Sequence, residues 1–454
     1  MVGTVGPFDE IARTMRVGPV ARDGRLPPGP RLPAIAQGAM FVLRIVPFFE
    51  RCRARYGSTF SLRLPTQPPI VVFSDESPIR EIFSLRPEDV SVGAAYEWMQ
   101  PFVGRSSLLL MDGEPHLRER RLLMPPFHQS RMQAYGATIR DIARRAMEGW
   151  PVDRPFVIEP AARSITLDII LQTVFGVGGS ELDELRRAIL DLLSDFSVFN
   201  LISALRVDLG RLTPWGRFLA HRAALDRLLF RLIRERRASG NRDRDDVLAM
   251  LLDARYDDDR PMRDEELRDE LVTLVGAGHE TSTSALAWVF QCLAHHPEAQ
   301  ARAHAEIERT PDDGDLPWTD AVVKETLRLH TVFPLVGRVL RGPQTIGGWE
   351  LPRGTLVYVS IDLTHRNPAL WPEAERFDPE RFLDARPRPF AYFPFGGGSR
   401  RCIGMSYASY ELRLIVAEAL RRFRIVPAGP PEAARTRGFT LAPANGAVVR
   451  LVPR

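Results

Sequence analysis

The stretch FPFGGGSRRCIG, from Phe393 to Gly404, sets one cysteine, Cys402, behind three consecutive glycines and two arginines. Glycine residues let a backbone turn tightly and approach a flat ligand closely. The apolar run from Met405 to Val416 predicts a helix that begins just after the cysteine. A thiolate at a helix N-terminus is stabilised by the helix dipole and by nearby backbone N–H groups. The stretch therefore predicts an anionic sulfur, and haem iron is one partner that accepts such a ligand.

Length and composition favour one large compact unit. The chain has 454 residues, and no charged or Ser/Gly-rich linker divides it. Residues 1–38 include the proline-rich segment LPPGPRLP and are predicted to be an extended N-terminal segment, followed by a single domain over residues 39–454. The hydrophobic content of 44% allows a large core with room for a buried cofactor.

Charge and cysteine usage exclude several classes of protein. The net charge is only +4, Lys324 is the one lysine, and the arginines alternate with acids, so we expect no nucleic-acid partner. Three widely spaced cysteines argue against a disulfide framework and for a reducing compartment. The apolar run 39–49 is short and contains Arg44, which argues against a transmembrane anchor or a signal peptide. We therefore expect a cytoplasmic protein.

Hydrophobic periodicity predicts a mainly α protein with a smaller β region. The predicted helices cover residues 48–56, 115–121, 132–150, 161–175, 181–196, 215–238, 246–254, 264–296, 297–309 and 320–330. The predicted strands cover residues 59–64, 70–73, 336–340, 345–346 and 355–360. The segment GAGHETSTS is expected to interrupt the longest helix in its middle.

Two stretches lack this periodicity. Residues 86–113 are rich in aromatic side chains, and long loops in compact domains are often functional. Residues 199–214 are irregular and apolar, so they are either a mobile lid or a plain connector.

The residues around the cysteine carry a resemblance to a known family. Taken alone, a cysteine in a glycine loop is most often an inert core residue. Here Phe395, Gly398, Arg400 and Gly404 stand seven, four and two positions before Cys402 and two after it. This spacing resembles the haem-binding signature of the cytochrome P450 family. The alternative of a phosphate-binding loop lacks the required Gly-Lys-Ser/Thr ending and a preceding strand.

A second motif stands in the middle of the longest predicted helix. The segment Ala277-Gly278-His279-Glu280-Thr281 is similar to the family's oxygen-activation motif. A glycine and a hydroxyl in mid-helix weaken the hydrogen-bond ladder and open a groove for dioxygen. Glu280 and Thr281 are then the catalytic pair that relays protons. The alternative is a threonine satisfied by its own helix. A zinc-protease interpretation fails, because no second histidine stands four residues after His279.

A third motif combines charges from two segments. Glu325 and Arg328 match the family's Glu-x-x-Arg, and Arg381 in FDPERF occupies the position of their usual partner. On its own such a pair is usually an exposed ion pair of little energetic value. The resemblance implies a buried network that holds the coil beneath the cysteine loop.

The resemblance also implies contacts to the cofactor's propionates. His116 and Arg120 match the family's pattern of His or Trp, three residues, then Arg, and Arg338 and Arg400 stand at other propionate-binding positions. The planar fork of arginine pairs bidentately with a carboxylate. The alternative is that the arginines around His116 form an ordinary solvated helix face.

Taken together, the motifs imply the cytochrome P450 fold, with haem b between the long central helix and the helix after the cysteine loop. Cys402 is the implied iron ligand, whose electron donation favours O–O cleavage. The implied activity is a monooxygenase that inserts one oxygen atom from dioxygen into a substrate, for example by hydroxylation. Two alternatives use the same cysteine: a haem-thiolate isomerase or dehydratase, which needs no external electrons, and a noncatalytic haem sensor.

The implied electrons originate from NAD(P)H and arrive through a separate ferredoxin or flavodoxin-type partner, because no fused redox domain is evident. Arg118, Arg121 and Arg401 are candidates for a basic docking face on a monomeric protein.

The substrate is expected to be lipophilic: a terpenoid, fatty acid, steroid or polyketide intermediate. The resemblance implies a mostly apolar pocket that includes Tyr96, Trp98, Phe102, Phe196, Phe199, Val332, Phe333 and Phe439.

Overall fold

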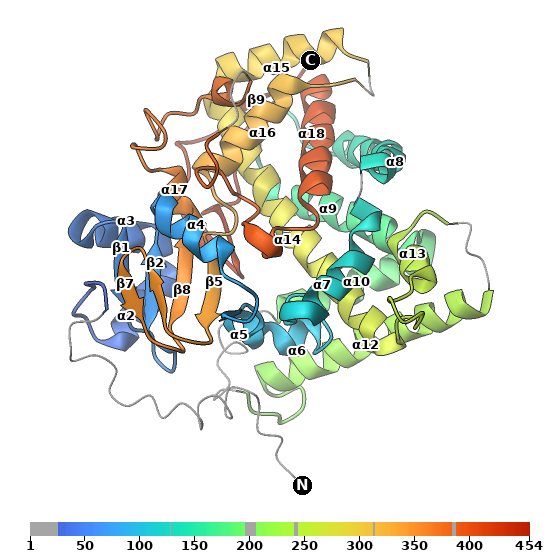
Figure 1. Cartoon of the computed structure of the whole chain (residues 1–454). Helices are drawn as coiled ribbons and strands as arrows, with labels where there is room; N and C mark the ends of the chain where they lie inside the picture. Colours follow the sequence, from blue (N-terminus) through green and yellow to red (C-terminus); the bar gives the residue numbers. More distant parts are fainter. Residues whose placement is uncertain (1–25, 128, 196–205, 240–243, 312–313, 384–386) are drawn as a thin grey trace.

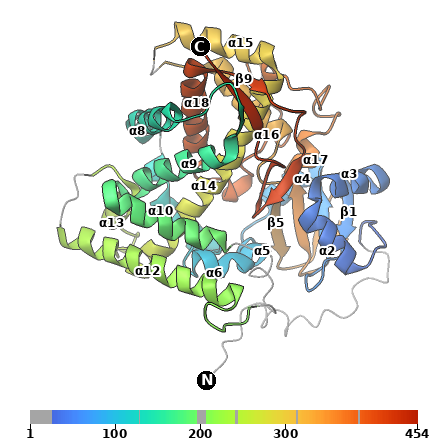
Figure 2. The ribbon, with the colours of Figure 1, turned by 180° about the vertical axis from the view of Figure 1, so that it is seen from behind.

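The computed structural model describes residues 26–127, 129–195, 206–239, 244–311, 314–383 and 387–454. A helical part occupies one side and the top of Figure 1, and a smaller β region with several short helices occupies the other side. Figure 2 shows the same two parts from behind, with α14 running between them. The predicted fold class, mainly α with a smaller β region, is confirmed.

The larger sheet has five strands in the order β1-β2-β8-β5-β3. Their bounds are β1 Thr59–Leu62, β2 Ile70–Phe73, β8 Leu356–Ser360, β5 Leu335–Leu340 and β3 Val90–Ser91. Strand β2 pairs antiparallel with β1 and parallel with β8, in the register Ile70 to Leu356. All four residues of β2 are buried, as expected for a continuous apolar run covered on both faces.

Three smaller sheets complete the described β structure. The orders are β4-β12-β9, β10-β11 and β6-β7, with bounds β4 Pro155–Val157, β12 Val448–Pro453, β9 Phe423–Pro427, β10 Ala434–Arg437, β11 Thr440–Pro443, β6 Gln344–Ile346 and β7 Trp349–Leu351. Strand β11 packs against α14, so the C-terminal hairpin reaches the centre of the molecule.

The helices pack around one long central helix, α14, which spans Asp264–His295. The other α-helices are α2 Ala34–Leu43, α3 Ile45–Tyr56, α4 Glu76–Ser84, α5 Gly93–Tyr96, α6 Gln100–Val103, α7 Gly113–Leu123, α8 Gln129–Glu148, α9 Ile158–Phe175, α10 Gly179–Ser194, α12 Pro214–Ser239, α13 Val247–Asp253, α15 Pro297–Arg309, α16 Pro317–Leu329, α17 Ile361–His365 and α18 Met405–Arg422. Helix α14 is buried on most sides, which is typical of a helix at the core of a large domain.

Several expectations need correction. Helix α14 is continuous from Asp264 to His295, so GAGHETSTS does not interrupt it, since a glycine inside a helix costs only about 1 kcal/mol relative to alanine. Residues 86–113 are not one irregular loop: they contain β3, α5, α6 and a short 3-10 helix, elements too short to give a periodic signal. Helix α2 crosses the expected boundary at residue 38, and Gln37 within it is fully buried with its amide bonded to the carbonyls of Pro30 and Leu32.

By length and composition, none of the described helices qualifies singly as a membrane span, although α9 and α10 together pass that test as a pair bent by 116°. Of the predicted lid or connector, residues 199–214, the part 199–205 lies outside the described residues.

Candidate haem site

The cysteine loop needs its glycines for two different reasons. Gly396 and Gly398 have positive φ angles of 70° and 67°, which favour a residue without a side chain. At Gly397 a Cβ atom would lie 2.6 Å from the ring of Phe83 on α4. The loop closes where the Cys402 amide donates to the Phe395 carbonyl at 3.0 Å. Backbone conformation and close packing therefore fix the position of the cysteine.

Cys402 differs from the other two cysteines, because Cys52 and Cys292 are buried and Cys402 is exposed. Helix α18 begins three residues later, with Gly404 as its N-cap, as predicted. The protein around the thiol desolvates it and raises its pKa, although the Gly404 N–H, Arg120 and Arg401 act in the opposite direction. Burial therefore opposes the anionic form that the sequence predicts, whereas the Gly404 N–H and the two arginines favour it. A coordinated metal ion deprotonates a thiol outright.

The four residues implied as propionate contacts come from three elements. His116 and Arg120 lie on α7, Arg338 lies on β5, and Arg400 precedes the cysteine. Burial and the neighbouring Arg400 and Arg120 lower the pKa of His116 to about 4, so its imidazole is neutral at pH 7. Burial lowers the pKa of Arg400 to about 10, and Arg338 and Arg120 add to this effect against the opposing Asp112. The three arginines thus lie close enough to lower the pKa of His116, and two of them lower that of Arg400.

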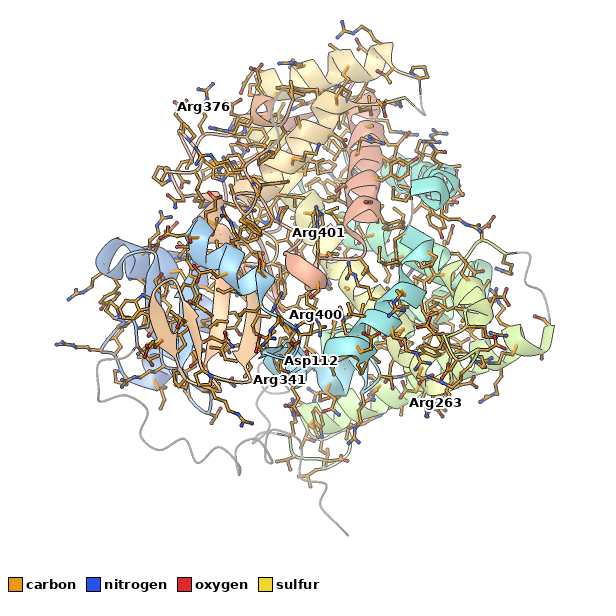
Figure 3. All side chains as sticks on the ribbon, viewed as in Figure 1. Asp112, Arg263, Arg341, Arg376, Arg400 and Arg401 are labelled. Atoms are coloured by element: carbon orange, nitrogen blue, oxygen red, sulfur yellow. The ribbon has the colours of Figure 1, made fainter. Side chains whose placement is uncertain are left out.

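Asp112 is the N-cap of α7 and the acid at this cluster. Figure 3 labels it beside Arg400 and Arg341. Its carboxylate accepts hydrogen bonds from the backbone N–H groups of Val92 and Gly93 at 2.8 and 3.1 Å, and from Arg341 at 3.1 Å. Although burial opposes ionisation, the Ser91 hydroxyl, the Gly93 and Val92 N–H groups and Arg400 together lower the pKa of Asp112. One carboxylate therefore organises the end of the basic cluster.

The basic cluster carries more positive charge than its single acid balances. Arg338 is 5% exposed and donates to the Gly337 carbonyl at 2.8 Å, yet it has no ion-pair partner among the described residues. A buried guanidinium without a carboxylate is costly unless a ligand supplies the counter-charge. An open sulfur next to surplus arginine charge fits a cofactor that carries both a metal ion and carboxylates, and haem has both.

The mostly buried helix α14 is exposed in its middle, at Ala277. Gly278 beside it packs against α9: a Cβ atom would lie 2.9 Å from Cδ1 of Ile170. The Thr281 hydroxyl donates to the Ala277 carbonyl at 2.6 Å. The bond to its own helix that we gave as the alternative is thus present in this structure.

Glu280 is held by a neighbouring helix. Its carboxylate forms an ion pair with Arg163 of α9, which also donates to Glu159 at 3.1 Å. Arg437 of β10 bonds to the same Glu159. A chain of alternating charges therefore leads from Glu280 toward the more exposed side chain of Arg437.

The predicted three-residue network lies together in the fold. Glu325 and Arg328 are both fully buried and joined by two hydrogen bonds of 2.6 and 2.8 Å, and Nε of Arg381 lies 3.5 Å from Glu325. Arg328 also donates to the carbonyls of His365 and Ala374, both at 2.8 Å. The network thus ties α16 to the coil that precedes the cysteine loop.

His365 supports the cysteine loop directly. Its Nε2 atom accepts a hydrogen bond of 3.0 Å from the Phe393 amide, the first residue of the loop. Burial, with Arg328 nearby, lowers its pKa to about 3, so the imidazole stays neutral and able to accept.

The predicted substrate pocket is brought together only in part. The rings of Tyr96, Phe333 and Phe439 form a row with centroid distances of 6.4 and 6.2 Å, and Val332 adjoins it in sequence. Phe102 instead packs against Phe218 of α12 at 4.6 Å in the main core.

Three pocket candidates remain. Trp98 lies in the 3-10 helix Glu97–Met99, and its carbonyl accepts a hydrogen bond from Arg206 at 3.5 Å. Phe196 and Phe199 lie outside the described residues.

The arginines proposed for docking differ in their pairing. Arg118 pairs with Asp258 at 2.6 Å, and Arg121 pairs with Glu114 and Asp257 at 2.8 and 3.0 Å. Arg401 is exposed beside the cysteine and is labelled in Figure 3.

Sequence reasoning missed Asp112 and Arg163. Asp112 carried a signal, because an Asp-Gly pair before a helical run is a typical helix start. Arg163 carried none, since its partner is 117 positions away in the sequence.

Comparison with known proteins shows the family of this chain. The sequence model of the family described as cytochrome P450 matches residues 27–449. A protein named "Putative cytochrome P450 138" from Mycobacterium tuberculosis is 36% identical over 442 residues, which cover 97% of this chain and 98% of that one. Another from the same organism, "Putative cytochrome P450 135B1", is 35% identical over 430 residues, or 94% and 91% of the two chains.

Solved structures share the fold. A cyanobacterial protein titled "Retinoic acid bound cyanobacterial CYP120A1" superposes with a TM-score of 0.83 at 26% identity, covering 94% of this chain and 99% of that one. The haem domain of cytochrome P450DA gives a TM-score of 0.81 at 24% identity over 94% and 98% of the two chains, which shows the fold alone. Fold and sequence similarity together define a haem-binding class of protein. This chain belongs to the cytochrome P450 family, whose cofactor is haem and whose general reaction is monooxygenation.

Proposed function

We propose that this protein is a monooxygenase that inserts one oxygen atom from dioxygen into a lipophilic substrate. Its electrons originate from NAD(P)H and arrive through a separate ferredoxin or flavodoxin-type protein. The observation that carries the proposal is an exposed cysteine, Cys402, within reach of the charge of Arg120 and two residues from Arg400. No other cysteine of the chain is exposed.

Haem b would be held by two sets of contacts. Cys402 would bind the iron, and Arg120, Arg338, Arg400 and the neutral His116 would bind the propionates. When bound, haem supplies dioxygen activation. The surplus positive charge of the cluster supports this assignment, because two propionates would balance it. They would also supply a counter-charge to the buried guanidinium of Arg338.

The chain's own catalytic pair would be Glu280 and Thr281. The Thr281 hydroxyl can donate to the oxygen site only when it releases the Ala277 carbonyl. A side-chain rotation achieves this without unwinding α14. Glu280 would deliver protons from the side of Arg163, whose guanidinium keeps the carboxylate oriented.

A lipophilic substrate is supported by the aromatic row of Tyr96, Phe333 and Phe439, since aromatic walls bind apolar molecules with few hydrogen bonds. A structural relative, the cyanobacterial protein, has retinoic acid bound, which is a largely hydrocarbon molecule. Terpenoids, fatty acids, steroids and polyketide intermediates all remain within this class.

The test is the carbon monoxide difference spectrum of the reduced protein. We expect a thiolate-type Soret band in the native chain and its loss in Cys402→Ala. Cys52→Ala and Cys292→Ala are matched controls that should keep the band, because both sulfurs are buried away from solvent. A native protein that is folded, loaded with haem and lacks the band contradicts the proposal.

A further inference from the structure

The segment 105–112 runs between α6 and α7 and contains neither a helix nor a strand. A partly buried segment of this kind must find hydrogen-bond partners for its backbone groups outside itself. One such partner is Arg400, which donates to the carbonyl of Leu108 at 3.2 Å and to that of Met111. The carboxylate of Asp112, at the end of the segment, accepts from the same guanidinium at 2.9 Å. The position of this segment therefore sets the position of Arg400.

Helix α14 also holds this segment, through two consecutive acids. The amide of Ser106 donates to Asp269 at 2.8 Å. The amide of Leu108 donates to Oε1 of Glu270 at 2.7 Å. Leu108 is thus bound at both of its backbone groups, through its N–H to Glu270 and through its carbonyl to Arg400. A single residue therefore links α14 to the cysteine loop.

The two acids of α14 differ in how their charge is balanced. Asp269 forms an ion pair with Arg268 at 2.7 Å. Glu270 is fully buried and forms no ion pair with any residue in the described part of the chain. Burial raises the pKa of Glu270 well above 4.5, and the charge of Glu119 on α7 adds to this against the opposing Leu108 amide. The neutral form of the carboxyl, which carries an O–H group, is therefore favoured.

One buried carboxyl oxygen on each of α7 and α14 lacks a hydrogen-bond partner among the described residues: Oε1 of Glu119 and Oε2 of Glu270. The other oxygen of each acid is used, because Glu119 accepts from the Tyr256 hydroxyl at 2.8 Å and Glu270 accepts from Leu108. A buried acceptor without a donor is costly. Since the charge of Glu119 acts on Glu270, a proton on Oε2 of Glu270 can be donated to Oε1 of Glu119 and satisfy both oxygens.

We propose that Glu270 is a positioning residue for Arg400. Its neutral carboxyl accepts from the Leu108 amide and donates to Glu119, so α14 and α7 together hold the segment whose carbonyls hold the guanidinium. The inference rests on the proposed contact between Arg400 and a haem propionate. It adds a residue that acts on the cofactor only through the segment 105–112.

Substitutions at position 270 separate this role from plain packing. Glu270→Leu is similar in size but cannot accept a hydrogen bond, so the Leu108 amide loses its partner. Glu270→Gln keeps a carbonyl acceptor and replaces the O–H donor by an N–H donor. Glu270→Asp withdraws the carboxyl by one methylene and replaces Glu270→Leu if that variant does not fold. Glu266→Gln is the matched control, because it lies one turn earlier on α14 and pairs with Arg260 and Arg263 instead of the segment.

Two measurements on haem-loaded full-length protein follow the segment and the cofactor. Hydrogen–deuterium exchange of peptides that cover residues 105–112 reports whether the segment is held, and haem transfer to an acceptor protein reports whether the cofactor is. We expect both rates to rise about tenfold in Glu270→Leu, and to stay native in Glu270→Gln and Glu266→Gln. Native exchange in Glu270→Leu, or a glutamine variant that behaves as the leucine variant does, overturns the inference.

An Arg400→Gln background tests whether Glu270 acts through that arginine. We expect Glu270→Leu to speed haem transfer in the native background and to add little in the Arg400→Gln background, because both changes remove the same contact. Equal acceleration by Glu270→Leu in both backgrounds overturns the positioning role.

The same samples distinguish failure of this inference from failure of the proposed function. If exchange rises in Glu270→Leu but Arg400→Gln transfers haem at the native rate, the propionate contact alone is overturned. The carbon monoxide spectrum is recorded on every variant: a native thiolate band with native exchange in Glu270→Leu overturns this inference alone. A missing band, with exchange that rises in Glu270→Leu and is restored in Glu270→Gln, overturns the proposed function alone.

Discussion

Arg400 and Asp112 form an ion pair in which Nη2 of Arg400 lies 2.9 Å from Oδ1 of Asp112. Arg400 also donates to the carbonyl of Leu108 at 3.2 Å and to that of Met111. The pair joins the cysteine loop to the start of α7, which carries His116. One contact therefore aligns two segments that are almost 300 positions apart in the sequence.

Asp112→Asn should weaken haem retention. The amide cannot match the charge of Arg400 and Arg341, and its NH2 group would face donors, so we expect a loss of about 1–3 kcal/mol in unfolding free energy. Urea unfolding and the rate of haem transfer to an acceptor protein measure both effects. Asp258→Asn, which removes an exposed partner of Arg118, is the control and should change neither quantity. Unchanged haem transfer in Asp112→Asn would contradict the positioning role.

Arg328→Leu should prevent accumulation of folded protein. Truncating Arg328 leaves the fully buried Glu325 with only the longer contact to Arg381 to balance its charge, at a cost of about 3–5 kcal/mol. Arg328→Lys should also destabilise the fold, because a single ammonium cannot replace the two-pronged bond and the carbonyl contacts. Yield and urea unfolding are the measurements. Arg80→Lys, in an exposed pair with Glu76, is the matched control, and equal losses in both lysine variants would refute the network's importance.

Thr281→Ala should uncouple oxygen consumption from product formation. The substitution removes the hydroxyl that we assign to proton delivery, so more of the NAD(P)H consumed should appear as hydrogen peroxide. The ratio of peroxide to NAD(P)H is the measurement, and Thr281→Ser should restore the native value. Thr283→Ala serves as the control, since its hydroxyl bonds to His279 and Thr166 on the face toward α9. Peroxide release equal to that of Thr283→Ala would argue against the relay.

The buried Glu411 should make the protein less stable as pH rises above neutrality. Burial raises its pKa from 4.5 to about 8, while the Ser282 hydroxyl bonded at 2.8 Å acts in the opposite direction. Between these two values the folded state binds more protons than the unfolded state, so stability falls as pH rises. We expect a loss of about 1 kcal/mol between pH 7 and pH 8.

Glu411→Gln removes this titration and should flatten the decline in urea unfolding free energy between pH 7 and 8. The exposed Glu298→Gln is the control and should retain the native slope. An unchanged slope in Glu411→Gln would mean that other groups set the alkaline stability.

Arg401→Glu should slow electron transfer from an acidic redox partner. Arg401 is exposed beside the cysteine, whereas the charges of Arg118 and Arg121 are already balanced by acids of the chain. We expect a lower association rate and a weaker dependence on salt, measured by stopped-flow reduction of the ferric protein. Reversal at Arg121 should have the smaller effect. Equal effects at both positions would exclude a docking site centred on Arg401.

The sequence predicted most helices and strands of the large sheet, because long amphipathic and apolar runs carry their own periodicity. Strand β2 and helix α15 match their predicted ranges. The short elements within residues 86–113 were missed, because four residues are too few to give a period. The sequence located the cysteine loop by its motif. It located the aromatic pocket only approximately, because part of that pocket lies on the short elements within residues 86–113.

What the sequence by itself determined is local: three glycines that let a loop turn, a cysteine two residues after an arginine, and a helix that begins behind it. What only the tertiary structure decided is where charges from distant segments meet. Asp112 at Arg400 and Arg163 at Glu280 are pairs between elements far apart in the chain, and nothing in their own sequence windows specifies the partner. Packing of the helices around α14 brings them together, because burial of the apolar faces fixes which polar edges come into contact.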